Sequence, residues 1–392
     1  MSTSIAEPGG LRAALGPRDL RLFALCVAGT AASALTDAFD VGAVLPFAVS
    51  AVALAVLASL VGHAVDALGD RLGAGATGVL QSALGNLPEL FVCLFALHAG
   101  LYDVVRAALV GSVLANVLLV LGLAFVVGGL KHGTQRFGQG RARTISMLLA
   151  LSVAAWLIPS LTDSLHTPAA GHERELSIVT AVLLLVLFAL SIPAAIRRSE
   201  LEPATDAPTA GAGAGAGAAT DARTGDGGED AAVASAEHVT RWPLWFAVAV
   251  LAIAGVAAAF VSDWFVAALT PAMDAVGISQ AFAGLVVVAI AGNAVENVVG
   301  IQLAARNQSD YALSVILQSP LQIALVLAPV LVLVAPLVGA TFTLVLSPLL
   351  VVSLVLTVFI AVLVVNDGES NWLEGASLLV LYALIATAFW WG

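Results

Sequence analysis

The sequence is poor in charge, and what positive charge it has is almost all arginine. Charged residues make up 10% of its 392 residues, hydrophobic residues make up 60%, and the mean hydropathy is +1.02. A typical soluble domain carries about 25% charged residues. The shortage of charge therefore excludes the soluble globular class and predicts a polytopic membrane protein.

Cysteine is scarce as well. Cys26 and Cys93 are the only two, both lie in apolar runs, and neither has metal-binding or redox spacing, so we expect small core residues. No small-residue cleavage site follows the first hydrophobic run, which predicts that the first helix is retained. The net charge of −11 argues against nucleic acid as a partner, and no motif indicates a cofactor.

Long apolar runs fill most of the chain. About 20 helical residues cross the roughly 30 Å of bilayer hydrocarbon. By that length criterion the sequence predicts an all-α polytopic membrane protein with eleven transmembrane helices. The predicted spans are 20–38, 42–63, 74–98, 104–129, 145–165, 175–196, 242–262, 279–305, 311–338, 343–365 and 371–391.

Arginine and lysine fall almost entirely on one side of these spans. With the N-terminus inside, thirteen basic residues lie in cytoplasmic segments and only Arg106 and Arg174 lie outside. Basic loops stay on the cytoplasmic side of membrane proteins. Because the Ala, Gly, Val and Arg usage is typical of a GC-rich bacterium, we expect a bacterial cytoplasmic membrane protein with a cytoplasmic N-terminus and an external C-terminus.

Residues 199–240 break the apolar pattern. They combine Ala-Gly alternation and prolines with eight acidic side chains. No apolar face is present to bury, so we predict a disordered acidic cytoplasmic linker. It divides the chain into an N-terminal tail with helix 1 (1–40), a first five-helix repeat (41–198) and a second five-helix repeat (241–392).

A polar motif recurs in the two halves. Because five spans is an odd number, the halves enter the membrane in opposite senses, which predicts inverted repeats with a shared site near mid-membrane, where they meet. Adding 207 to the residue number carries Gly85, Asn86, Glu89, Asp103 and Ser112 onto Gly292, Asn293, Glu296, Asp310 and Ser319.

The two glutamates indicate function, because a carboxylate at hydrocarbon depth costs several kcal/mol to insert. Asn86 and Glu89, like Asn293 and Glu296, are three residues apart and share a helical face. Calcium takes six to eight oxygen ligands, and two glutamates would match its charge. Emptied of the ion, the carboxylates would repel each other and take up protons. Competition of cation and proton for one site is the minimal chemistry of an antiporter.

Smaller polar residues lie in the next span of each half. Ser112 with Asn116, and Ser319 with Gln322, share helical faces. We expect Ser112 and Ser319 to be ligands or near-ligands, with interhelical hydrogen bonding as the alternative. Gly85 and Gly292 permit either an unwound turn or close packing, and Pro88 is expected to kink its helix.

Other charged residues lie at predicted span ends. Asp103 and Asp310 begin spans, where capping of free N–H groups is the expected role. His63, Asp66 and Asp70 close the second span on the cytoplasmic side, and Asp263 follows the seventh on the outer side. These four could line an ion path, and a solvated helix end is the alternative.

With these residues laid out, the chain resembles the calcium/proton exchanger (CAX-type) branch of the calcium/cation antiporter superfamily. The resemblance rests on the two Gly-Asn-x-x-Glu motifs and on segments 111–116, 261–296 and 364–375. It implies eleven spans, an acidic loop between the halves and alternating access driven by the proton gradient. It also implies ion coordination and proton exchange at Glu89 and Glu296, with the helpers Asn86, Asn293, Ser112 and Ser319.

The chain departs from that family at a few positions. Asn297 replaces the usual His, which removes a titratable group from any proton path there. Gln318-Ser319-Pro320 replaces a frequent Gly-Ser-Ser. Pro88 is also typical of the sodium/calcium exchanger relatives, so the counter-ion stays open.

Together these observations predict a proton-coupled antiporter, not an enzyme, that exports calcium or a related divalent cation in exchange for protons. A sodium-coupled exchanger or a sodium/proton antiporter stays open, because oxygen ligands accept both ions. An intramembrane hydrolase with paired carboxylates is a remote alternative, and inverted duplication argues against it. A calcium channel is disfavoured by the pair of titratable ligands. The sequence leaves open whether the chain forms a homo-oligomer.

Overall fold

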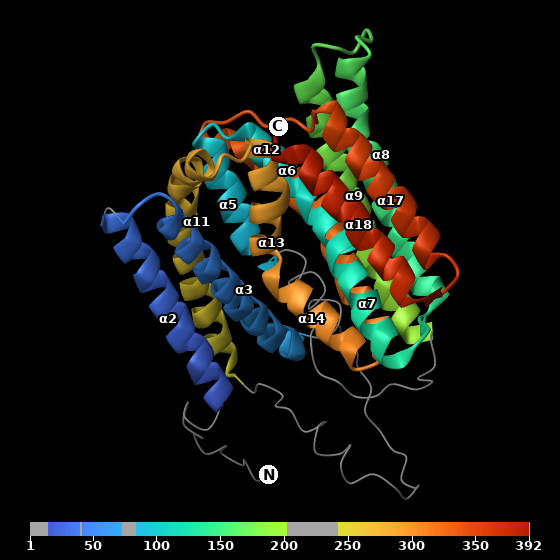
Figure 1. Ribbon diagram of the computed structural model, residues 1–392, viewed down its shortest axis with the longest axis horizontal. Helices are drawn as coiled ribbons and strands as arrows, with labels where there is room; N and C mark the ends of the chain where they lie inside the picture. Colours follow the sequence, from blue (N-terminus) through green and yellow to red (C-terminus); the bar gives the residue numbers. More distant parts are fainter. Residues whose placement is uncertain (1–14, 40, 73–83, 202–241, 392) are drawn as a thin grey trace, which may run out of the picture.

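The computed structural model describes residues 15–39, 41–72, 84–201 and 242–391. Most of the predicted acidic linker and the first part of the predicted span 74–98 lie outside these residues. The described chain is almost entirely helical (Figure 1).

The helices follow the apolar runs of the sequence, interrupted by short π-helical segments. The first half contains α2 (Pro17–Ala38), α3 (Val44–Leu72), α5 (Leu87–His98), α6 (Tyr102–Leu114), the π-helix η1 (Ala115–Val120), α7 (Leu121–His132), α8 (Gln139–Ser164) and α9 (Glu173–Leu201). The second half contains α11 (Leu244–Val276), α12 (Gln280–Phe282), the π-helix η2 (Ala283–Val288), α13 (Ala289–Gly292), α14 (Ala294–Ala305), α15 (Ser309–Gln322), the π-helix η3 (Ile323–Leu327), α16 (Ala328–Val334), the 3-10 helix η4 (Ala335–Val338), α17 (Pro348–Val365) and α18 (Trp372–Trp390). The strands β1 (Gln135–Arg136) and β2 (Glu369–Ser370) pair antiparallel.

The prediction of a helical membrane protein is confirmed. Among the described residues, nine helices are long and apolar enough to cross a membrane, and a tenth crossing is added if α12 to α14 are one bent span. The count of eleven stays a prediction. The described part of the predicted span 74–98 is α5, which has 12 residues.

Two helices are longer than predicted. α3 continues to Leu72 and α11 to Val276, past the predicted ends at 63 and 262. Asp66 and Asp263 therefore lie inside helices, and the expected position of Asp263 beyond a span is wrong. The predicted ends lie where the apolar run meets a charged or polar residue. A helix can continue past such a residue, because its backbone hydrogen bonds do not depend on the side chain, provided that the side chain can reach a surface or a groove.

The site helices lie between two groups of helices. α2, α3 and α11 pack against one another, and α5 packs against both α11 and α6. In the second half α14 contacts α3 on one side and α7 and α15 on the other. Figure 1 shows α5, α13 and α14 in this intermediate position. The motif residues at the beginnings of α5 and α14 are thereby buried in the middle of the protein.

The two halves approach closely where α6 crosses η2. A Cβ atom at Gly111 would collide with the backbone of Leu285, and one at Gly284 would collide with the carbonyl of Val104. Small residues permit such backbone contact between membrane helices. The crossing places Ser112, the residue after Gly111, against the second half of the chain.

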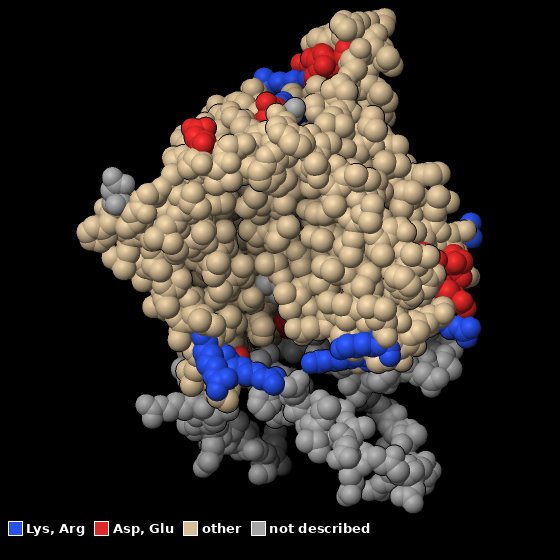
Figure 2. All heavy atoms as spheres, in the orientation of Figure 1, with Lys and Arg blue, Asp and Glu red and all other residues tan. Residues whose placement is uncertain are grey.

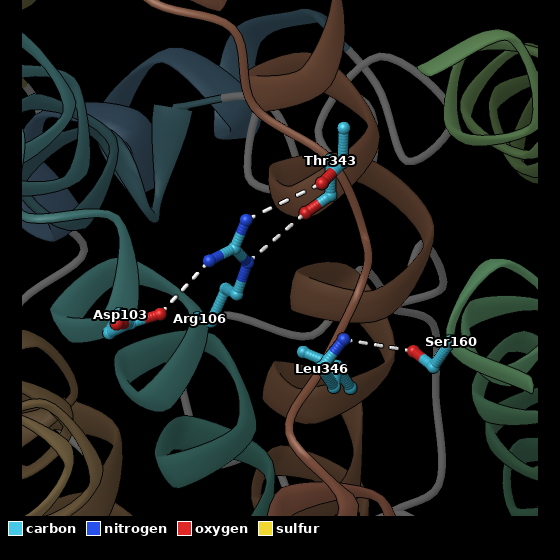
Figure 3. A network of polar contacts seen from close by, with 5 residues as sticks. All are labelled: Asp103, Arg106, Ser160, Thr343 and Leu346. Atoms are coloured by element: carbon cyan, nitrogen blue, oxygen red, sulfur yellow. Dashed lines mark hydrogen bonds and ion pairs between the residues drawn. The ribbon is translucent and has the colours of Figure 1, made fainter. Parts of the chain in front are cut away.

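Residues 340–347 are extended and not helical, so the tenth predicted span begins too early. Leu346 donates its backbone N–H to Ser160 Oγ at 2.9 Å, and Arg106 donates from Nη2 to Thr343 Oγ1 at 3.4 Å (Figure 3). Side chains of α6 and α8 thus bond the polar groups of this segment. Backbone that lacks helical hydrogen bonds needs such partners in or near a bilayer.

The capping role expected for Asp103 and Asp310 is wrong. Each is the second residue of its helix, and neither α6 nor α15 has a side-chain cap. Asp103 instead accepts a hydrogen bond from Arg106 at 2.9 Å (Figure 3). Asp310 accepts from the backbone N–H of Gly138. Because Arg106 contacts the second half and Gly138 belongs to the first, both aspartates help to hold the halves together.

Candidate cation-binding site

An asparagine marks a helix break in each half. α5 begins after Asn86, while α13 ends and α14 begins at Asn293. The backbone angles are nearly the same, φ −93° and ψ 19° at Asn86, and φ −108° and ψ 19° at Asn293. Glu89 and Glu296 are each the third residue of the helix that follows. A helix N-terminus carries partial positive charge, which favours a carboxylate there.

Pro88 lies just after the break in its span. It is the second residue of α5, where its missing N–H would have no intrahelical partner. Residues 73–83 lie outside the described chain, so the expected kink of the whole span stays a prediction. The second half breaks at the matching asparagine without a proline, and the helical parts before and after this break meet at 65°.

Four of the six predicted ligands form one directional chain of hydrogen bonds. Ser319 donates from Oγ to Asn293 Oδ1 at 3.0 Å, and Asn293 donates from Nδ2 to Ser112 Oγ at 3.0 Å. Ser112 in turn donates to Glu89 Oε1 at 2.5 Å. The chain begins in the second half and ends on the glutamate of the first, so the two halves share one site.

Asn116 belongs to the same network, although we did not include it among the expected ligands. It donates from Nδ2 to the carbonyl of Ser112 at 2.9 Å and lies 3.4 Å from Ser319 Oγ. It therefore bridges the two serines. Its position four residues after Ser112 was the available signal, since residues at that spacing share a helical face.

Asn86 and Glu296, the other two expected ligands, lie at the edge of the network. Asn86 is 8% exposed and its Nδ2 has no partner among the described residues. Glu296 is half-buried, and its carboxylate has no hydrogen bond with a described side chain. The structure thus joins four predicted residues directly and leaves these two side chains with open bonding capacity.

Glu89 is buried with one oxygen unsatisfied. It is 1% exposed, and Oε2 has no partner among the described residues. A cavity of about 10 Å³ lies beside it, lined otherwise by apolar side chains such as Leu54 and Phe265 and by Gly292. A buried charge without a partner is costly, so this carboxylate requires a cation or a proton.

π-helical turns follow the two serines at matching places. η1 begins three residues after Ser112, and η3 begins four residues after Ser319. Such turns interrupt the regular hydrogen-bond ladder and occur often at functional sites. Sequence periodicity did not reveal them, because one extra residue in a helical turn leaves the apolar pattern of these segments almost unchanged; Asn116 is the one polar residue in η1, and η3 has none.

The sodium/calcium exchanger protein family model matches residues 42–196 and 246–391. The chain is 33% identical over 368 residues to the Ca²⁺/H⁺ antiporter ChaA of Bacillus subtilis, covering 94% of this chain and 98% of that protein. It is 32% identical to a Ca²⁺/H⁺ antiporter of Aphanothece halophytica, over 88% of this chain and 89% of that one.

Solved structures show the same fold. The structure of native YfkE matches with a TM-score of 0.74 and 30% identity, over 94% of this chain and 99% of that chain. The H⁺/Ca²⁺ exchanger CAX matches with a TM-score of 0.67, 17% identity, and 94% and 91% coverage. The latter identity is low enough that this likeness concerns the fold alone.

Proposed function

The chain belongs to the sodium/calcium exchanger protein family, and from that premise we propose that it is a proton-coupled antiporter exporting calcium or a related divalent cation in exchange for protons. The observation that carries the proposal is the hydrogen-bond chain that joins Asn293 and Ser319 of one half to Ser112 and Glu89 of the other. Relatives named Ca²⁺/H⁺ antiporters support the choice of ions.

The donor set suits a hard divalent cation. Calcium takes carboxylate and amide carbonyl oxygens and water. Glu89 and Asn293 offer the first two kinds, and the Ser112 hydroxyl lies within hydrogen-bond distance of both side chains. The expected ligands are Glu89, Glu296, Asn86, Asn293, Ser112 and Ser319. Cation binding at Glu89 would displace the Ser112 hydroxyl proton from Oε1 and turn the serine oxygen toward the ion.

The same residues suit proton binding when the cation leaves. Glu89 is buried, so its ionised form has little solvation to replace a lost cation. Its free Oε2 can carry a proton while Oε1 still accepts from Ser112. Cation and proton therefore exclude each other at one carboxylate. An exchanger requires that exclusion, because its binding site must change from one side of the membrane to the other while it holds either the cation or the proton.

The proposed orientation places the N-terminus in the cytoplasm and the C-terminus outside. Lys and Arg side chains gather along the lower edge of the molecule in Figure 2. α2 begins and α14 ends at this edge, and α18 ends on the opposite side (Figure 1). A basic face is retained on the cytoplasmic side. Inverted repeats between these two faces suit a transporter that opens alternately to each.

Purified protein in liposomes tests the proposal. We expect calcium uptake when a pH gradient is imposed with no sodium present, and loss of that uptake in Glu89→Gln. Uptake driven by a sodium gradient at uniform pH, and not by a pH gradient, would assign the coupling to sodium instead. Uptake that needs neither gradient and does not saturate would indicate a channel.

A further inference from the structure

An open groove lies between α5 and α11, separate from the cavity at Glu89. Its volume is about 570 Å³, and its lining is apolar except for one charged side chain, Asp263. α5 and α11 are in contact within this lining where Leu87 meets Gly255, whose added Cβ would be 3.3 Å from the leucine. Asp263 is the last α11 residue of the lining, so it lies at the end of the groove toward the C-terminal end of α11.

Asp263 has no structural role visible in the described part of the chain. It is exposed in the groove and forms no hydrogen bond or ion pair with a described residue. It lies 13 residues before the end of α11 at Val276, about 20 Å along a helix. A carboxylate inside a membrane helix is costly and indicates function.

The chemistry of the groove favours a proton over a divalent cation. Calcium needs six to eight oxygens, and magnesium needs an octahedral set that is nearly as demanding. Asp263 is the only charged side chain of the lining, and Leu87, Phe91, Phe95 and the α11 residues around it supply no further side-chain oxygen. A proton requires a single acceptor.

A buried hydroxyl lies next to Asp263 in the chain. Ser262, the neighbour of Asp263, is fully buried, and its Oγ has no partner among the described residues. Phe265, three residues further on, shares its helical face and lines the cavity beside Glu89. Ser262 therefore lies on the face of α11 whose residue Phe265 borders the cavity of Glu89.

We propose that Asp263 is the outer proton acceptor of the exchanger and that Ser262 passes the proton toward Glu89. This inference rests on the proposed function. The Asp263 carboxylate takes a proton from outside water. It gives that proton to the Ser262 oxygen as the serine hydroxyl gives its own proton toward Glu89 Oε2, through water in the cavity when the transporter opens. Each group returns to its starting state, and the net result is one proton moved to Glu89.

Among the residues that the structure describes, no other titratable side chain lines this groove. The helices that pack against α11 are α2, α3 and α5. Their titratable or charged residues whose side chains the structure describes are Arg18, Asp19, Arg21, Cys26, Asp37, His63, Asp66, Glu89, Cys93 and His98. None of these lines the groove, and His98 at the end of α5 contacts the carbonyl of Val338 at 3.1 Å. Changes at Asp263 therefore report on Asp263 itself.

The test compares two transport modes of the full chain in liposomes. Calcium/proton exchange needs proton delivery, whereas exchange of labelled for unlabelled calcium at equal pH does not. We expect Asp263→Asn to slow calcium/proton exchange at least about tenfold, since a positioned proton-transfer group typically contributes about 100-fold or more. Calcium/calcium exchange should stay within about twofold of the wild type. Asp263→Glu should restore most of the lost rate, and Ser262→Ala should show a smaller loss confined to the proton-coupled mode.

Asp274→Asn is the matched control, because Asp274 is an exposed aspartate on the same helix outside the groove. We expect it to match the wild type in both modes. Unchanged calcium/proton exchange in Asp263→Asn, across all outer pH values, would overturn the inference. An equal loss of both modes would also overturn it, since that pattern indicates a cation ligand or a structural role. Failure of the proposed function is distinct, because wild-type protein would then show no proton-driven uptake.

Discussion

The two glutamates of the motif occupy equivalent positions but different environments. Both are the third residue of a helix that begins after an asparagine of nearly the same backbone conformation. Glu89 is 1% exposed and accepts a 2.5 Å hydrogen bond from Ser112. Glu296 is half-buried and has no hydrogen bond to a described side chain. The two glutamates therefore have equivalent positions in the sequence repeat but different burial and hydrogen bonding in this conformation.

This difference is what an alternating-access transporter requires. If both halves had the same environment, an inverted pair would be symmetric and neither membrane face would be closed in preference to the other. The structure has one glutamate enclosed by the shared network and the other more accessible. We infer that the opposite state exchanges these roles, with Ser319 in place of Ser112 as the hydrogen-bond donor to a glutamate.

The largest expected effect comes from neutralising either member of the pair. Glu89→Gln and Glu296→Gln should each reduce calcium/proton exchange more than about 100-fold, because each change removes a charge that both cation and proton need. Initial uptake rates in liposomes measure this. Glu175→Gln, at an exposed acid in the first turn of α9, is the control and should transport normally. Full activity in either motif variant would show that a single glutamate is enough for exchange, and would contradict the proposal that the two halves form one shared site.

The second comparison concerns two glycines near the site. Gly111→Ala should destabilise the protein by about 1–3 kcal/mol or more, because its methyl group would overlap the backbone of Leu285. Gly292→Ala should be mild, because its Cβ would lie 3.5 Å from Glu89 Cγ, an ordinary contact. Thermal unfolding in detergent, followed by size-exclusion chromatography, separates the two. Equal stability of both variants would contradict the close crossing of α6 and η2.

The two serines test whether the halves contribute unequally. Ser112 bonds a carboxylate directly, while Ser319 bonds the neutral Asn293. Calcium binding is expected to replace the bond from Ser112 to Glu89 with a contact between the Ser112 oxygen and the ion, so Ser112→Ala removes an oxygen ligand beside the carboxylate. We expect it to weaken calcium affinity by about tenfold, and Ser319→Ala, whose hydroxyl reaches Glu89 only through Asn293 and Ser112, to weaken it by about threefold. Calorimetric titration measures both. A larger effect at Ser319 would mean that the binding state differs from this structure.

Much of this arrangement could be predicted from sequence. The motif residues Asn86, Glu89, Asn293 and Glu296 carried a signal because polar residues in apolar runs are rare and the spacing repeats. The position of Asp263 could not be predicted, since helix length in a membrane protein is set by packing as well as by hydropathy. The chain of contacts between Asn293 and Glu89 depends on how the halves cross, and a pattern within one helix holds no information about that crossing.

Asn297 provides a smaller, pH-dependent comparison. It is 9% exposed, its Oδ1 has no partner among the described residues, and it follows Glu296 in the chain. Asn297→His would introduce an imidazole with an ordinary pKa of about 6.5. Below that pH the added positive charge should repel the cation and weaken its affinity about threefold more than in the wild type, with no difference at pH about 8. An identical affinity profile from pH 5.5 to 8 would place residue 297 outside the electrostatic reach of the site.

The smallest effects are expected where arginines join the halves at the two faces. Arg106 is 21% exposed in its side chain and contacts both Asp103 and Thr343, while Arg136 is 80% exposed and pairs with Glu369 alone. Exposed ion pairs contribute about 0–1 kcal/mol, so Arg136→Ala should leave the melting temperature unchanged within error. Arg106→Ala should lower it by a few degrees, because the polar groups of Thr343 lose their partner. If Arg136→Ala proves more destabilising than Arg106→Ala, the ion pair of Arg136 with Glu369 holds the halves together more strongly than its exposure implies.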